Sequence, residues 1–205
     1  MSIERIDDRI RERSLLTHEF YQSWSAGMLT REALAGYAKE YFALVKAVPE
    51  MMEPMVASAP AALRADVAEQ REEEASHLPL WAGFAQAFGI SREELDSHEA
   101  LPETQEAIAL MKSLTADDFA RAACAMYALE LEIPAIAKTK LEGLEKLYGI
   151  TADSALEYFR EHSEADVRHA ATWRAIVADR PDADAIERSL DAQHKLLDGC
   201  VRVYC

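Results

Sequence analysis

The sequence has few of the residues that build sheets, membrane spans and disulfide frameworks. It has only 7 glycines and 7 prolines among 205 residues, few for a protein of strands and turns and normal for a helical one. No stretch approaches the roughly 18 consecutive apolar residues that a membrane span needs. The three cysteines are odd in number, which argues against a disulfide framework and for a reducing compartment. The N-terminus shows no secretory signal, so we expect a cytoplasmic protein that does not bind a membrane.

Basic residues are scarce as well. The chain has 22 lysines and arginines against 37 aspartates and glutamates, which gives a net charge of −15. A nucleic-acid backbone repels such a protein, and we expect its partner to be a small molecule. Most acidic residues fit solvated helix faces, but carboxylates inside a helical bundle are also the ligands of iron and manganese sites. Composition alone leaves both interpretations open.

What the sequence does contain is a helical pattern. Apolar residues recur at helical spacing, with no internal repeat and no linker, which predicts a single domain, 1–205, folded as an all-α bundle of about seven helices. Pro49 and Pro134 lie inside long helical patterns, where each should kink its helix. The predicted segments are residues 3–15, a helix capped by Thr30, one opened by a Ser91–Glu94 capping box, one from Thr115 to Tyr148, one from Thr151 to Arg180, and one over about 183–203.

One predicted helix carries a polar stripe. At about 100° per residue, Tyr158, His162, Asp166 and His169 fall on one narrow face. Two imidazoles and a carboxylate in this arrangement suit a metal ion. They suit a buried hydrogen-bond network equally well, and the spacing alone does not decide between the two.

A second cluster contains the motif Glu74-x-x-His77. This i, i+3 pair is what di-iron carboxylate bundles project into their cores. Glu73, four residues before His77, would reach the same face and is an alternative ligand. Taken by itself, an acidic run that ends in histidine is more typical of a solvated helix face.

A third feature is a carboxylate within a long apolar stretch. Glu130 follows Met126 and Tyr127 on the predicted buried side, whereas Glu132 points away from it. A buried carboxylate is costly unless a cation or hydrogen-bond donors lie beside it. We therefore interpret Glu130 as a bridging metal ligand and Glu132 as solvated.

The three segments together predict a dinuclear metal site. Three carboxylates and three imidazoles suit two octahedral ions, and we expect two irons, with manganese or a mixed Fe/Mn pair as alternatives. Zinc prefers four ligands, often with thiolates, and the cysteines are not placed to help. The predicted ligands are Glu74 (or Glu73), His77, Glu130, His162, Asp166 and His169.

With these motifs the chain resembles the haem-oxygenase-like diiron oxidases, and within them the chlamydial death-domain-associating proteins and their bacterial relatives. The resemblance spans nearly the whole chain. The wider fold group includes thiaminase-II-like and pyrroloquinoline-quinone-synthase-like proteins, which share the bundle but lack this full ligand set. The similar segments are residues 18–24, 37–41, 78–81, 130–144 and 161–169.

The resemblance implies O₂ activation at a dimetal centre supplied by an external reductant. In these relatives the reaction is a self-sacrificing synthesis of 4-aminobenzoate for folate, in which one of the protein's own tyrosines supplies the ring. By position, Tyr21 matches the consumed tyrosine and Lys140 the lysine implicated as amino donor. Tyr37 and Tyr158 match further aromatic residues of the site, and we expect a homodimer. Without the resemblance, the tyrosines fit core packing and Lys140 fits the surface.

Two positions differ from the relatives that make 4-aminobenzoate. They have a glutamate seven residues before the histidine that matches His77, where this chain has Gln70, and a tyrosine where it has Leu129. An alternative is therefore a dimetal oxidase that acts on an external fatty or amino acid. Two others are a metal-free binding protein and a thiaminase-like enzyme, although Cys124 lies in an apolar stretch that does not activate a thiol.

Overall fold

A computed structural model describes residues 2–116 and 118–205 of the chain, apart from the side chains of residues 164–167. The described residues form helices and no strand, and seven of these helices have twelve or more residues, which confirms the all-α bundle of about seven helices. The elements are α1 Ile3–Glu12, a 3₁₀ turn Leu15–Thr17, α2 Glu19–Ser25, α3 Arg31–Ser58, α4 Arg64–Gln86, α5 Arg92–Ser97, α6 Pro102–Thr115, α7 Phe119–Glu130, α8 Ile133–Lys146, α9 Asp153–Asp179 and α10 Ala183–Tyr204.

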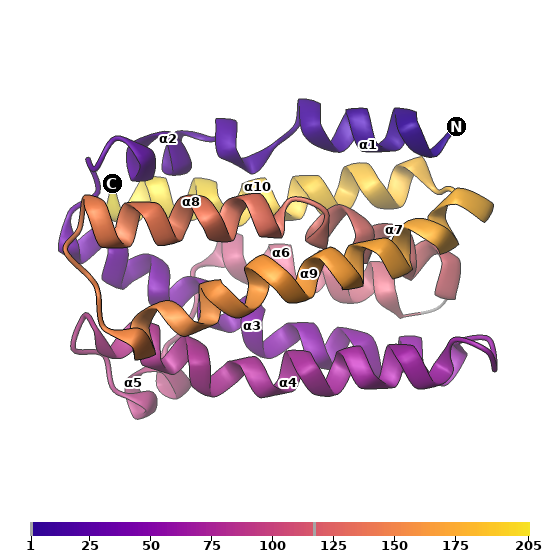
Figure 1. Ribbon diagram of the computed structural model, residues 1–205, viewed down its shortest axis with the longest axis horizontal. Coiled ribbons are helices and arrows are strands. Elements are labelled where there is room, and N and C mark those ends of the chain that lie inside the picture. Colours follow the sequence, from indigo (N-terminus) through magenta and orange to yellow (C-terminus); the bar gives the residue numbers. More distant parts are fainter. Residues whose placement is uncertain (1, 117) are drawn as a thin grey trace.

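The long helices run side by side along the longest axis of the molecule, with α9 between α8 and α4 (Figure 1). Helix α3 packs mainly on α4, and α10 packs on α6 and α7. All three tryptophans, Trp24, Trp81 and Trp173, are completely buried among these helices. Among the described helices, none is both long and apolar enough to cross a membrane.

Several helices begin where the sequence predicts. The Thr30 hydroxyl accepts a hydrogen bond from the amide of Ala33, which caps α3. Ser91 and Glu94 form the predicted capping box at the start of α5, each side chain accepting from the other residue's amide. Such caps satisfy amides that the first turn of a helix leaves without partners.

The predicted kink at Pro134 is wrong, because the chain forms two helices there. Helix α7 ends at Glu130, and Pro134 lies in the first turn of α8. A proline inside a helix clashes with the carbonyl four residues earlier, here that of Glu130, and has no amide to bond it. In the first turn neither problem arises. The break places Glu130 at a helix end and Glu132, predicted to be solvated, in a half-buried position before α8.

The helix predicted to start at Thr115 starts later. Thr115 is the last residue of α6, and its buried hydroxyl donates to the carbonyl of Met111. Asp118 caps α7 instead, and its carboxylate accepts from the amide of Arg121. A threonine can bond its own helix in this way, so its presence does not identify an N-cap.

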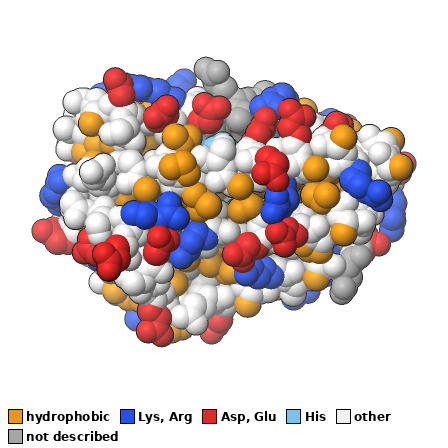
Figure 2. Space-filling model, turned by 90° about the horizontal axis from the view of Figure 1, so that it is seen from below, with side chains coloured by type: hydrophobic (Ala, Val, Ile, Leu, Met, Phe, Trp, Pro, Cys, Tyr) orange, Lys and Arg blue, Asp and Glu red, His pale blue; other side chains and the backbone are white. Residues whose placement is uncertain are grey.

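Acidic and basic side chains are mixed over the face shown in Figure 2. Several acidic residues pair with a basic one, as Glu53 does with Arg71 and Glu50 with Lys112. Exposed pairs of this kind contribute about 0–1 kcal/mol each. The carboxylates that bear on chemistry are the few inside the bundle.

Candidate metal centre

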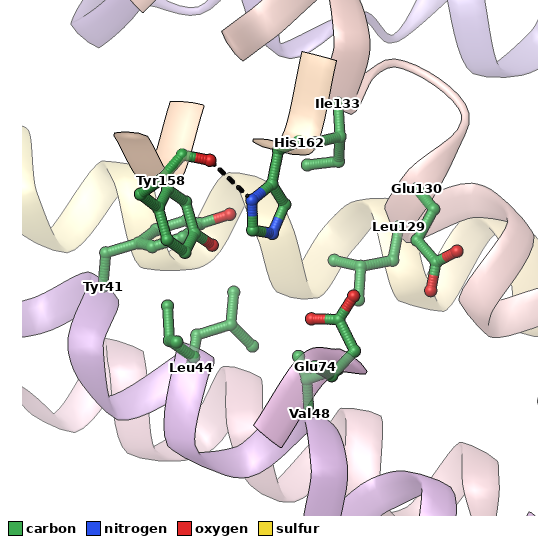
Figure 3. A pocket seen from close by; sticks show the side chains of 10 residues that line it. Tyr41, Leu44, Val48, Glu74, Leu129, Glu130, Ile133, Tyr158 and His162 are labelled. Atoms are coloured by element: carbon green, nitrogen blue, oxygen red, sulfur yellow. Dashed lines mark hydrogen bonds between the residues drawn. The ribbon is translucent and has the colours of Figure 1, made fainter. Parts of the chain in front are cut away.

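A central cavity lies where α3, α4, α7, α8 and α9 meet. The volume of this cavity, counted as the space that the centre of a water-sized sphere can occupy, is about 30 Å³. By the same measure about 10–15 Å³ is enough for one water. The carboxylates of Glu74 and Glu130 and the ring of His162 point into it from three different helices (Figure 3). The other lining residues are Tyr41, Leu44, Val45, Val48, Leu129, Ile133 and Tyr158.

Three predicted ligands come together at this cavity. One ligand atom each from Glu74, His77 and His162 lie within 4.8 Å of one another, and all three side chains are buried. The rings of His77 and His162 are 4.3 Å apart between centroids. Burial alone would raise the pKa of Glu74, but a hydrogen bond from His77 and the nearby histidines lower it below its usual range. Glu74 is therefore a carboxylate.

Hydrogen bonding fixes which nitrogen of His162 can bind a metal. Its Nδ1 lies 2.8 Å from the carbonyl oxygen of Tyr158, one helical turn earlier. Because a carbonyl only accepts, Nδ1 carries the proton and Nε2 carries the lone pair, the form in which imidazole binds metals. The Tyr158 ring stacks on the imidazole at 3.9 Å and holds its plane.

His169 is oriented in a similar way by Glu73. Its Nε2 lies 2.6 Å from the Glu73 carboxylate, and its Nδ1 lies 3.6 Å from the carboxylate of Glu74. Burial alone would raise the pKa of Glu73, but hydrogen bonds from His169 and Arg168 lower it. Glu73 thus orients a histidine, whereas Glu74 faces the cavity.

Glu130 is held by a residue that the sequence prediction missed. Its carboxylate accepts a hydrogen bond of 2.8 Å from the indole nitrogen of Trp173. Trp173 follows His169 by one turn on the same helix face, and this continuation of the stripe was the available signal. A metal-ligating carboxylate usually has such a partner behind it.

Asp166 is among residues 164–167, whose side chains lie outside the described part of the chain, so its role as a ligand stays a prediction. Gln70 lies on α4 one turn before Glu74 and is buried, and its side-chain oxygen has no hydrogen-bond partner among the described residues. It does not line the central cavity, where Glu74 supplies the carboxylate of this helix.

The three clustered residues fit a metal ion. Three ligand atoms on one face of an ion, each about 2.0–2.2 Å from it, lie about 3 Å apart, so these three side chains, whose ligand atoms lie within 4.8 Å of one another, would close in on a bound ion. Two histidines and one carboxylate with open positions are the donor set of non-haem Fe(II) oxygenases. Glu130 and His169 lie beside this set, where they could serve a second ion.

Lys140 lies in the core rather than at the surface. Its side chain is 2% exposed, and its amine is 2.5 Å from the Tyr37 hydroxyl. Five aromatic rings surround the amine at 4.7–5.9 Å from their centroids, those of Tyr21, Tyr37, Tyr41, Trp81 and Phe159. Among the described residues no carboxylate pairs with it, and burial lowers the pKa of Lys140 to about 7. A substantial fraction of this amine is uncharged at neutral pH.

The aromatic rings connect the lysine to the cavity. Burial raises the pKa of Tyr21 and of Tyr37 well above the usual value, so both are neutral phenols. The ring of Trp81 stacks on Tyr41 at 4.9 Å and meets the edge of Tyr158 at 4.7 Å. Tyr158 in turn stacks on His162, so continuous aromatic packing joins the two parts of the core.

These features agree with the comparisons to known proteins. Residues 35–197 match the family of iron-containing redox enzymes. The match covers more than half of the chain, and the protein belongs to this family and is a metal-dependent oxidoreductase. A solved structure from Shewanella denitrificans, described as a domain with a haem-oxygenase-like fold, matches 98% of this chain and 90% of its own with a TM-score of 0.81 at 18% identity. The fold is therefore haem-oxygenase-like.

Relatives with closer sequences carry a more specific name. The chain is 34% identical over 192 residues to the 4-aminobenzoate synthase of Chlamydia muridarum, a match that covers 90% of this chain and 81% of that protein. It is 33% identical over 225 residues to the 4-aminobenzoate synthase of Nitrosomonas europaea, covering 98% and 92%. The predicted resemblance to this group is confirmed.

Replacing Glu73 by glutamine should weaken metal binding without removing a ligand. The glutamine amide at position 73 lacks the negative charge that attracts the protonated Nε2 of His169. The imidazole therefore turns more freely and is a poorer ligand. Loss of such a partner costs about 10–100-fold in metal affinity, which titration of the metal-free protein with Fe(II) measures. Glu72→Gln, one residue earlier on the exposed side of α4, is the matched control. Equal affinity of the Glu73 and Glu72 variants would refute the orienting role.

Proposed function

We propose that this protein is an O₂-activating oxygenase that makes 4-aminobenzoate from its own Tyr21, with Lys140 as the source of nitrogen. The observation that carries the proposal is the buried Lys140 amine, enclosed by Tyr21 and Tyr37 in the same core as the histidine and glutamate cluster. The name of the relatives, 4-aminobenzoate synthase, supports it. The cytoplasmic location and the homodimer stay predictions.

The chemistry of the product explains why a tyrosine suits as precursor. The ring and the Cβ atom of tyrosine together hold all the carbon atoms of 4-aminobenzoate, with the oxygen in the para position. Conversion requires cleavage of the Cα–Cβ bond and oxidation of Cβ to a carboxylate. It also requires replacement of the phenol oxygen, which leaves as water, by the amino group of Lys140, whose Cε–Nζ bond breaks so that the lysine is left as an aldehyde. The net change is an oxidation, for which O₂ is the oxidant and an external reductant supplies the remaining electrons.

The ligand residues divide naturally between two ions. Glu74, His77 and His162 would hold one, and His169 with Asp166 would hold the other, while Glu130 at the end of α7 would bridge them. The resident ions would be iron, with manganese or a mixed pair as alternatives, and when bound they would supply the activation of O₂. Leu44, Val48 and Ile133 form an apolar wall beside these ligand residues.

The residues around Lys140 prepare the amine for transfer. An ammonium group has no lone pair, so the amine can attack only after it loses its proton. Burial promotes that loss because it removes water from the charged amine, and the lowered pKa of Lys140 shows that this outweighs the attraction of the ring faces for a cation. The hydroxyl of Tyr37, 2.5 Å away, holds the amine in place and can exchange a proton with it.

Mass spectrometry of the protein tests this function directly. Metal-free protein is loaded with Fe(II) without oxygen, and O₂ and a reductant are then added. We expect 4-aminobenzoate in solution and an equal amount of chain with a mass loss at Tyr21 and a second mass change at Lys140. Tyr21→Phe should give no product, whereas Tyr148→Phe, at a tyrosine that bonds the Trp24 carbonyl away from the site, should still give it. Product from the Tyr21 variant, or iron-loaded protein that leaves Tyr21 intact, would refute the self-sacrificing reaction.

A second candidate is an oxidase that acts on an external fatty or amino acid. The apolar wall of the central cavity and the spacing Glu74-x-x-His77 favour it. The small size of the cavity, about 30 Å³, argues against a long acyl chain unless the bundle opens. Uptake of O₂ that accelerates with an added acid and leaves every tyrosine intact would establish this alternative.

A further inference from the structure

A second, smaller cavity lies directly behind the central one, between α3, α6, α7 and α10. Leu44 and Leu129 line both cavities and form the partition between them. The far wall of this rear chamber is made by Ala107 and Met111 of α6 and by Ala192 and Leu196 of α10. The volume of the rear chamber, measured in the same way, is about 10 Å³, which is room for about one very small molecule.

The rear chamber presents almost only hydrocarbon. Gln193 is the one polar residue among those that line it, and its amide nitrogen is taken up by the carbonyl oxygens of Ala128 and Ser189. A water needs two to four polar partners, and small apolar cavities in proteins stay dry and bind apolar guests such as xenon. The chemistry of this wall selects a small apolar molecule against water and ions.

We infer that the rear chamber binds a small apolar gas, that its occupant in the working enzyme is O₂, and that O₂ passes Leu44 and Leu129 to reach the central cavity. This inference rests on the proposed use of O₂. Transfer of a nonpolar molecule from water to an apolar chamber is favourable, so the chamber raises the local concentration of gas beside the candidate ligands. The partition consists of two leucine side chains, and leucines change rotamer without movement of the backbone.

The end of an acyl chain is the competing occupant. It would have to extend from the central cavity through the partition, and the rear chamber has about a third of the small volume of that cavity. The packing of Met111 and Leu196, each 1% exposed, leaves no room for an acyl chain to continue beyond the far wall. Size therefore favours a diatomic gas.

Xenon binding to the metal-free protein tests the chamber without any activity. Crystals under xenon pressure should show one xenon between Leu129 and Met111, and Ala107→Met, which fills the chamber, should remove it. The matched control is Ala109→Met on the exposed side of α6. Met111→Phe serves as a second filling variant if Ala107→Met does not fold. No xenon in the native chamber, or a soaked dodecanoate seen to run through it, would overturn the inference.

Oxygen dependence then tests the assignment of O₂ with iron-loaded protein. The O₂ concentration that gives half-maximal uptake should rise about fourfold or more in Ala107→Met. A fourfold change corresponds to the loss of a binding free energy equal to that of roughly one buried methylene. Ala109→Met should match the native protein. An unchanged O₂ dependence in the filled variant would overturn the inference even if the reaction itself is intact. Native protein that binds xenon but takes up no O₂ would instead refute the proposed function, and with it the assignment of O₂ to this chamber.

Discussion

Iron binding should fall by more than about 100-fold when Glu74 is replaced by glutamine, because loss of a ligand outweighs the 10–100-fold cost of losing a partner behind one. Glutamine keeps the shape of the side chain, so the helix and the packing around His77 should persist. What disappears is the negative charge that three buried histidines surround. Titration of metal-free protein with Fe(II) gives the affinity, and circular dichroism confirms the fold.

The acidic run on α4 provides its own control series for this result. Glu72 is exposed, Glu73 reaches His169, and Glu74 faces the central cavity. Their glutamine variants should therefore show no change, a moderate loss and a severe loss of iron affinity, in that order. Equal losses at all three positions would indicate a general effect of surface charge and contradict a ligand role for Glu74.

Helical spacing was enough to predict which residues share a face. Glu74 and His77 lie together on α4, and His162 and His169 on α9, because residues three, four or seven apart stack along a helix. The spacing could not choose between Glu73 and Glu74, since both lie near His77 on an ideal helix. That choice depends on how α4 is rotated toward α9, which only the packing of the bundle fixes.

Two other features were beyond the reach of helical spacing for a definite physical reason, although the family resemblance did place Lys140 in the site. A single helix running through Glu130 places Lys140 about 80° away from it, which suggested a surface lysine. The break before Pro134 ends that relation, and α8 packs on α9 and α2 with its own orientation. The role of Trp173 does not follow from the spacing of carboxylates and histidines, but its buried indole nitrogen needs an acceptor and finds Glu130.

Replacing Lys140 by methionine should abolish 4-aminobenzoate formation and at the same time stabilise the fold. Methionine fills a similar space and removes the amine that the proposed reaction transfers. The pKa of Lys140 in the folded protein, about 7, lies below the usual lysine value of 10.5. Between those pH values the unfolded chain binds more protons than the folded one, so the stability of the native protein rises with pH across this window.

The two effects have separate signatures. The stability gained by Lys140→Met should be largest below pH 7, where native Lys140 is charged and buried, and should shrink as the pH approaches 10.5. Urea denaturation at several pH values measures it, and the same samples loaded with iron report product. Lys138→Met, at an exposed position on the same helix, should change neither quantity. A Lys140 variant that still makes 4-aminobenzoate would show that the nitrogen comes from elsewhere, whereas a variant that is stable, binds iron and makes none is the result expected if Lys140 supplies it.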